Sequence, residues 1–123
     1  MDFDALREFC LSLPLTEETT PFDETTLVYK VCGKMFALTD MVESGSVSVK
    51  CDPALAEELR DRHPEDITPA YHFNKKHWNS VRTDGDLPAN LVREQIMNSY
   101  WLVVNGLPKA KRVEVYRLHA EQG

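Results

Sequence analysis

The residues best equipped for chemistry lie in one short segment, from Tyr71 to Trp78. Its sequence, YHFNKKHW, places three aromatic rings, two lysines, two imidazoles and an amide within eight residues. Such a mixture is costly to bury, because every buried polar group needs a hydrogen-bond partner. We therefore expect part of the segment to form a binding surface, in which lysines hold phosphate groups while a ring stacks or wedges.

Each polar residue of this segment also has a plainer structural role. His72 and His77 are interpreted as hydrogen-bond partners of a loop, and Asn74 as the residue that fixes a turn through its side-chain amide. For Tyr71 and Trp78 the alternative is core packing with a hydrogen-bonded polar tip at the surface.

The spacing of the potential ligands argues against a structural metal. His72 and His77 are five residues apart, which places them on opposite faces of a strand, and the chain has no Cys-x-x-Cys or His-x-x-x-His pair. It also lacks a Gly-x-Ser-x-Gly nucleophile motif and a glycine-rich phosphate loop. We therefore expect neither a cofactor nor catalysis.

Positive charge is local in this chain of formal net charge −6. Residues 1–66 carry 15 acidic and 6 basic residues, whereas residues 67–123 carry 5 acidic and 8 basic residues. A cationic cluster on one face matters more for anion binding than the total charge does. The basic residues of the second part are Lys75, Lys76, Arg82, Arg93, Lys109, Lys111, Arg112 and Arg117.

Length and composition indicate one cytoplasmic domain over residues 1–123. A chain of 123 residues is long enough for one hydrophobic core. No apolar run approaches the roughly 20 residues that span a bilayer, and the N-terminus is acidic where a signal peptide is basic. The three cysteines are scattered and odd in number, which favours reduced thiols packed as small hydrophobes.

The first half of the chain is predicted to form a helix and three strands. An amphipathic helix capped by Asp2 or Asp4 ends before Pro14. Alternation then predicts a strand from Thr25 onward, a Cys32–Gly33 turn, a returning strand from Met35 to Thr39 and a third strand from Ser46 to Lys50. In the third strand Val47 and Val49 face the core, which leaves Ser46, Ser48 and Lys50 on the other face.

The second half is predicted to alternate between helices and short strands. Asp52–Pro53 begins a short helix, and Pro69 restricts a strand over residues 67–71 to an edge of the sheet. A better strand runs from His77 to Arg82. The longest helix is capped by Asp86 and ends at Asn105–Gly106 in the left-handed conformation.

The order of these elements predicts an α+β fold, in which helices flank an antiparallel sheet. Beyond Gly106 the pattern leaves helix and strand open, and we expect the C-terminal tail, residues 113–123, to fray.

Three sequence blocks resemble the MmcQ/YjbR-like family of small bacterial proteins. They are SVKCDP at residues 48–53, YHFNKKHWNSV at residues 71–81, and SYWLVV at residues 99–104 followed by LPK at residues 107–109. The resemblance implies a CyaY/frataxin-like fold in a double-wing arrangement, and on that ground DNA binding. It also raises iron binding on an acidic helix face as a third candidate, for which the residues are Asp2, Asp4, Glu8, Glu17 and Glu18. Phe73 stands where the family pattern has methionine, and the net acidic charge departs from that of a general DNA coat.

We predict a non-enzymatic DNA-binding protein that uses a local basic and aromatic surface. The alternative is a module that binds a small anionic ligand or a protein in the same place, between the sheet and the long helix, completed by Ser99 and Tyr100. The candidate residues for either role are Lys50, Tyr71, His72, Asn74, Lys75, Lys76, His77, Trp78, Arg82, Lys109, Lys111 and Arg112.

Overall fold

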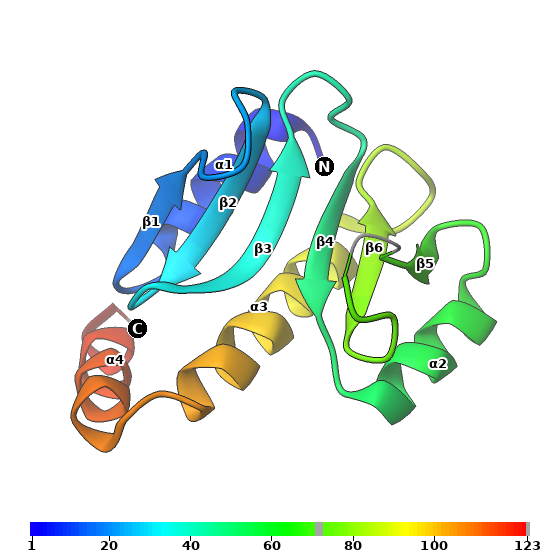
Figure 1. The fold of residues 1–123 in the computed structure, drawn as a ribbon. Helices are drawn as coiled ribbons and strands as arrows, with labels where there is room; N and C mark the ends of the chain where they lie inside the picture. The colour runs from blue at the N-terminus through cyan, green and yellow to red at the C-terminus, as the bar shows by residue number, and fades with distance from the viewer. Residues whose placement is uncertain (71–72, 123) are drawn as a thin grey trace.

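The computed structural model describes residues 1–70 and 73–122 (Figure 1). Within these residues the chain forms four helices and six strands. In chain order they are α1 (Phe3–Ser12), β1 (Thr16–Thr19), β2 (Thr26–Val31), β3 (Lys34–Asp40), β4 (Ser46–Lys50), α2 (Pro53–Arg62), β5 (Ile67–Pro69), β6 (Trp78–Arg82), α3 (Ala89–Asn105) and α4 (Lys109–Gln122).

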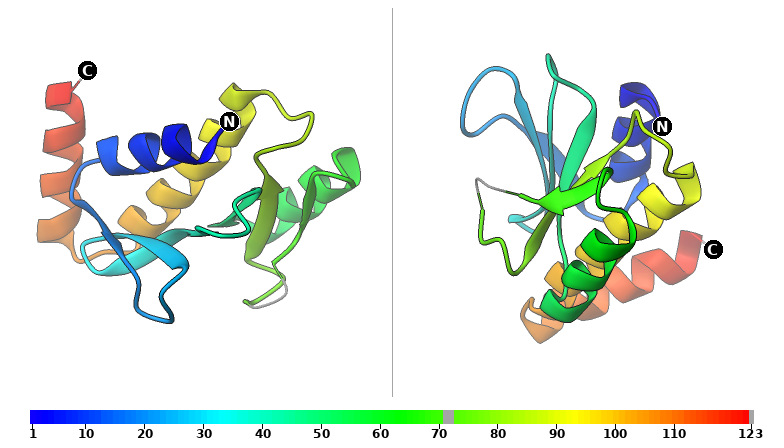
Figure 2. Two further views of the ribbon diagram at one scale, coloured as in Figure 1. Left: turned by 90° about the horizontal axis from the view of Figure 1, so that it is seen from above. Right: turned by 90° about the vertical axis from the view of Figure 1, so that its right-hand side faces the viewer.

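The described strands form one antiparallel sheet in the order β1-β2-β3-β4-β6-β5. The helices lie on one side of it, as both views in Figure 2 show. α3 packs against the central strands β2, β3 and β4, α1 against β1, α2 against β5, and α4 against α3. This arrangement confirms the predicted α+β class, and in the described part of the chain no helix covers the opposite, open face of the sheet.

Local sequence signals predicted several elements correctly. Asp2 caps α1 by accepting a hydrogen bond from the Ala5 backbone N–H, and Asp52 caps α2 in the same way. Cys32 and Gly33 both have positive φ angles, 49° and 81°, as a two-residue type I′ hairpin turn requires. Pro69 ends β5, which is an edge strand as predicted.

α3 ends at Asn105–Gly106 as predicted, but the predicted cap at its start and the predicted conformation of Gly106 are wrong. The helix begins at Ala89, behind Pro88, and has no side-chain cap, so Asp86 does not cap it. Gly106 has a φ angle of −91° rather than a left-handed conformation. The reason is that the Gly106 and Leu107 N–H groups bond to Val103 and Val104, so the last turn tightens instead of reversing.

The structure shows two segments whose secondary structure the sequence pattern did not settle. β1 was not predicted, because its sequence TEET has no apolar residue that would reveal a strand period. The tail after Gly106, for which helix and strand were left open, is helical through Gln122, and Val115 buries its side chain in the core.

Candidate functional site

The turn that leads into β6 is built around Asn74. Its side-chain Oδ1 accepts a hydrogen bond from the Lys76 N–H at 3.0 Å, and its carbonyl oxygen accepts from the His77 and Trp78 N–H groups. This confirms the predicted role of Asn74 and leaves Lys75 and Lys76 exposed at the tip of the turn. The predicted site residues Tyr71 and His72 lie outside the described residues.

Trp78 begins β6 directly opposite Lys50, the last residue of β4. The indole stacks on Phe73, with ring centroids 4.9 Å apart and planes inclined by 27°. Both aromatic side chains are half-buried. The stacked pair is therefore held in place and still presents part of its surface to solvent.

Lys50 and Trp78 share a hollow of about 240 Å³ between the sheet and the C-terminal end of α3. Lys34, which follows the hairpin turn, also lines it, and Leu107 closes it from the chain between α3 and α4. Lys34 was not among the site residues predicted from the sequence. Its position after the Cys32–Gly33 turn was a usable signal, because that turn must lie at the same end of the antiparallel strands as Lys50.

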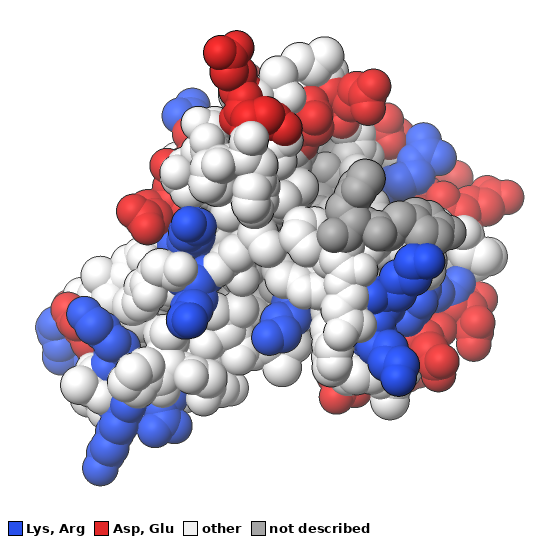
Figure 3. All heavy atoms as spheres, in the orientation of Figure 1, with Lys and Arg blue, Asp and Glu red and all other residues white. Residues whose placement is uncertain are grey.

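Charge is segregated along the strand direction. One end of the sheet, the basic end, carries Lys34 and Lys50, with the turn of Lys75 and Lys76 beside Trp78. Lys30 lies at the same end, opposite Glu17 of β1. The opposite end, the acidic end, carries Asp23, Asp40 and Glu43. Figure 3 shows most Lys and Arg side chains in the lower half of this face and many Asp and Glu side chains along its upper edge.

The remaining predicted cations are spread over the molecule. Arg82 lies at the acidic end, opposite Ser46, and its Nε is 3.2 Å from a carboxylate oxygen of Asp84. The structure therefore separates Arg82 from Lys50. The other three, Lys109, Lys111 and Arg112, lie in the first turns of α4.

The first turns of α4, which carry Lys109, Lys111 and Arg112, and the Asn74 turn lie on opposite sides of the hollow. Lys109 follows the hollow-lining Leu107 by two residues, and in Figure 1 the start of α4 and the turn before β6 lie at opposite sides of the molecule. The basic groups thus form a discontinuous line across the lower part of the face rather than a compact cluster.

Ser99 and Tyr100, which were expected to complete a ligand site, are fully buried and structural. The Tyr100 hydroxyl donates to the Pro14 carbonyl oxygen at 2.7 Å, and its ring packs edge-on against Phe36. Burial raises the pKa of the Tyr100 hydroxyl above its ordinary value.

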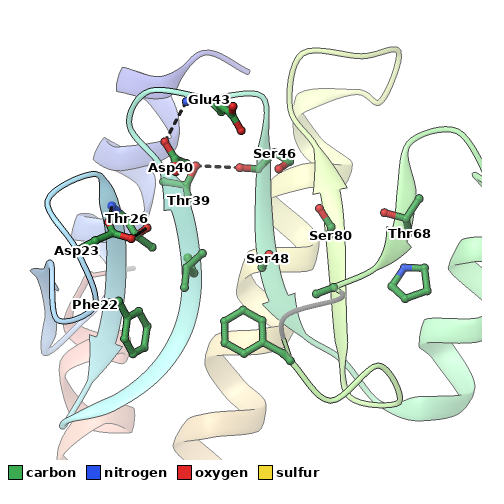
Figure 4. A pocket seen from close by; sticks show the side chains of 14 residues that line it. Phe22, Asp23, Thr26, Thr39, Asp40, Glu43, Ser46, Ser48, Thr68 and Ser80 are labelled. Carbon is green, nitrogen blue, oxygen red and sulfur yellow. Dashed lines mark hydrogen bonds between the residues drawn. The ribbon is translucent and has the colours of Figure 1, made fainter.

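A larger groove of about 700 Å³ lies on the open face of the sheet (Figure 4). Ser48, Ser80 and Thr68 are register partners on β4, β6 and β5, so their side chains form a row across its floor. Phe22 and Phe73 supply aromatic surface. Ser46 and Ser48 were predicted to lie on the face away from the core, which the structure confirms. The groove itself was not predicted as a site.

Two carboxylates of the acidic end also brace turns. Asp23 accepts hydrogen bonds from the Thr25 and Thr26 N–H groups and hydroxyls, and these bonds lower the pKa of its carboxyl. Asp40 Oδ1 accepts from the Val42 and Glu43 N–H groups. Both acids therefore hold fixed positions beside the groove.

Two of the five acids considered for iron, Asp2 and Glu18, have other partners in the structure. Asp2 caps α1, and Glu18 forms two hydrogen bonds with the Arg7 guanidinium and one with the Tyr29 hydroxyl. The hydrogen bond from Arg7 is the main reason that the pKa of Glu18 is lowered.

All three cysteines are free thiols, as the sequence predicts. Cys10 and Cys51 are buried, and burial raises the pKa of Cys10 to about 12. A buried thiol with so high a pKa is poorly reactive at neutral pH.

The chain is similar to known proteins along most of its length. Residues 11–102, which include every described strand, match the model of the YjbR family. The chain belongs to the YjbR family. This YjbR-family chain is 37% identical over 113 residues to the uncharacterized protein YjbR of Escherichia coli K12, covering 91% of this chain and 95% of that protein.

Two further relatives extend the match. The uncharacterized protein YbdF of Escherichia coli O157:H7 is 35% identical over 120 residues, covering 94% of this chain and 98% of that protein. The crystal structure of Deinococcus radiodurans protein DR2400, which has a DUF419 domain, superposes with a TM-score of 0.85 at 48% identity, covering 93% of this chain and 87% of that one.

Among the described helices of the YjbR-family chain, none is long and apolar enough to cross a membrane.

Proposed function

We propose that this YjbR-family chain binds DNA, without catalysis, through the basic end of its sheet. The observation that carries the proposal is the meeting of Lys34, Lys50 and Trp78 around one hollow. There two ammonium groups can hold backbone phosphates while the Phe73–Trp78 stack offers a ring to a base. The CyaY-like, double-wing description implied by the family resemblance is part of this proposal.

The net negative charge does not prevent such binding. Ser46 and Lys50 stand at the two ends of β4, so the acidic and basic ends are separated by about 13 Å at roughly 3.3 Å per residue. The Debye length is about 8 Å at physiological ionic strength. Phosphates at the basic end are therefore largely screened from Asp40 and Glu43.

The line of cations also suits an extended polyanion. Lys75 and Lys76 flank the hollow on the β6 side, and Lys109 and Lys111 flank it on the α4 side. A backbone that follows this line meets several ammonium groups in succession, which is the usual source of nonspecific DNA affinity. If five of them contact phosphates, log K falls with log salt with a slope of about −4.5.

A second candidate is a small anion held in the hollow alone. It is favoured by the concave shape of the hollow, whose 240 Å³ is small but bracketed by Lys34 and Lys50. Titration with inorganic phosphate in the absence of DNA, at constant ionic strength, separates the two candidates. Saturation at millimolar phosphate favours the small-anion site, whereas no saturation together with salt-dependent DNA binding favours the DNA surface.

The test is a fluorescence-anisotropy titration of short labelled DNA, duplex and single-stranded, at about 50 mM and about 200 mM salt. We expect binding at low salt, weakening at high salt, and a loss of about tenfold in affinity for Lys34→Glu or Lys50→Glu. Arg117→Glu is the matched control, because Arg117 pairs with Glu121 far along α4 and the change in net charge is the same. Absence of binding at low salt, or equal affinities of the Lys50→Glu and Arg117→Glu variants, overturns the proposal.

A further inference from the structure

The groove on the open sheet face has the dimensions of a small-molecule site. Its volume of about 700 Å³ falls within the range of roughly 300–1,000 Å³ that ligand pockets occupy. It lies apart from the hollow at the basic end, because the Phe73–Trp78 stack stands between them, with Phe73 lining the groove and Trp78 lining the hollow. We propose that the groove binds a small organic cation, a primary amine on a flat or hydroxylated body.

The floor of the groove carries three hydroxyl groups that make no hydrogen bond to another described residue. Ser48, Ser80 and Thr68 lie side by side on three neighbouring strands, and Figure 4 shows them along one side of the groove. In the described part of the chain, no hydrogen bond to another protein group occupies these hydroxyls. A row of partly exposed hydroxyls can both donate to and accept from a polar ligand, which fixes its orientation.

Charge selects a cation. Asp23, Asp40 and Glu43 line one end of the groove, and its described lining contains no lysine or arginine. Asp23 and Asp40 are held by backbone N–H groups, so their negative charge is pre-positioned. Arg82 also lies at this end of the sheet but pairs with Asp84. An anionic ligand here would meet three like charges, whereas an ammonium group would be attracted by all three carboxylates.

Aromatic surface favours the same ligand. Phe22 is 65% exposed on the loop before β2, and its ring stands beside the groove in Figure 4. So large an exposed ring loses contact with water when a ligand body covers it. The faces of Phe22 and Phe73 also attract a cation directly through their quadrupoles.

The protein contains a built-in reporter for occupancy of the groove. Phe73 stacks on Trp78, so a ligand against Phe73 alters the surroundings of the indole. The second tryptophan, Trp101, packs against Tyr100, Tyr116 and His119 in the α3–α4 region. A Trp101→Phe variant therefore leaves Trp78 as the sole source of tryptophan fluorescence.

The experiment compares tyramine with phloretic acid, which share a phenol ring on a two-carbon chain but end in an ammonium and a carboxylate group. Amide N–H chemical shifts and Trp78 fluorescence are recorded in the Trp101→Phe protein with each compound up to about 10 mM, enough to saturate a site with a Kd near about 1 mM. We expect tyramine to shift the amides of Ser48, Thr68 and Ser80 and to change the Trp78 emission. Phloretic acid should leave them unchanged.

Variants of the acidic residues test whether the groove selects a positively charged ligand. Asp40→Asn keeps the oxygen that braces the turn, and together with Glu43→Gln it should weaken tyramine binding by about tenfold. Glu57→Gln, on the exposed face of α2, is the control for loss of an acid outside the groove and should have no effect. The proposal is overturned if tyramine produces no shifts in the groove, if phloretic acid binds equally well, or if the groove variants bind tyramine as tightly as the control does. None of these outcomes bears on the DNA titration, which reports on the basic end.

Discussion

The Ser99 hydroxyl on α3 bonds to the Lys50 backbone at the point where β3 and β4 separate. This hydroxyl accepts a hydrogen bond from the Lys50 N–H at 2.8 Å and donates one to the Phe36 carbonyl oxygen at 2.6 Å. The β3–β4 ladder itself pairs only Ala37 with Val49 and Leu38 with Ser48. A helix side chain therefore replaces the missing rung of the sheet and fixes the backbone that carries the Lys50 ammonium into the hollow.

Ser99→Ala should destabilise the protein by about 2–4 kcal/mol, because it leaves a buried N–H and a buried carbonyl oxygen without their partner. Urea unfolding followed by circular dichroism measures the change. Ser44→Ala, in the exposed loop before β4, is the control and should stay within about 0.5 kcal/mol of the wild type. Equal unfolding midpoints for the two variants would show that the bridge does not stabilise the fold.

The two flanks of the hollow should contribute independently to DNA affinity. Lys75→Glu with Lys76→Glu alters the β6 flank, and Lys109→Glu with Lys111→Glu alters the α4 flank. Because the flanks share no partner, their losses in binding free energy should add when all four changes are combined, and each pair should make the salt slope shallower by about 1–2. Anisotropy titrations measure both quantities. If the α4 pair leaves affinity and slope unchanged, DNA contacts only the β6 flank.

The parts of the fold that follow from the sequence are those set by local pattern. Leu27, Tyr29 and Val31 alternate toward the core, and a one-residue slip would turn all three toward solvent, so burial leaves one register. β1 was not predicted because its position also depends on residues of other elements. Glu18 in that strand is held by Arg7 of α1 and Tyr29 of β2, a relationship that no local window contains.

The candidate site was predictable only where its residues are neighbours in the chain. The Asn74 turn is formed by consecutive residues, whereas the hollow is lined by Lys34, Lys50 and Leu107 from three separate segments. Arg82 shows the converse, because its position only four residues after Trp78 along an extended strand places it at the opposite end of the sheet. Closeness in sequence therefore predicted a grouping of Arg82 with Trp78 that the structure does not have. It gave no sign that Lys34 and Leu107 meet at the hollow.

The bonds to Glu18 predict a component of acid instability. Its folded pKa is lowered, chiefly by the Arg7 hydrogen bond, so the folded protein holds this proton less tightly than the unfolded chain does. The resulting stability is fully present above the ordinary glutamate pKa and is lost as the pH falls through the lowered one. Glu18→Gln should therefore flatten the dependence of unfolding free energy on pH in this acidic range.

Urea titrations between neutral and acidic pH measure this slope. Glu17→Gln, on the same strand but exposed, is the matched control and should retain the wild-type slope. The assignment to Glu18 fails if both variants lose stability with pH as steeply as the wild type does.

The side chain of Asn79 is the clearest exception to polar pairing in the core. It is 1% exposed on β6, on the helix-facing side of the sheet, between Val49 and Pro69 in register. Among the described residues neither its Oδ1 nor its Nδ2 has a hydrogen-bond partner. A buried amide with no partner among the described residues forfeits its bonds to water. Asn79→Leu, a change to an apolar side chain of nearly the same shape, should therefore raise the unfolding free energy by about 1–3 kcal/mol. Asn79→Ala is the companion variant and should destabilise, because it leaves a cavity instead. Destabilisation by leucine as well would mean that the amide is bonded in solution, for example to a buried water molecule.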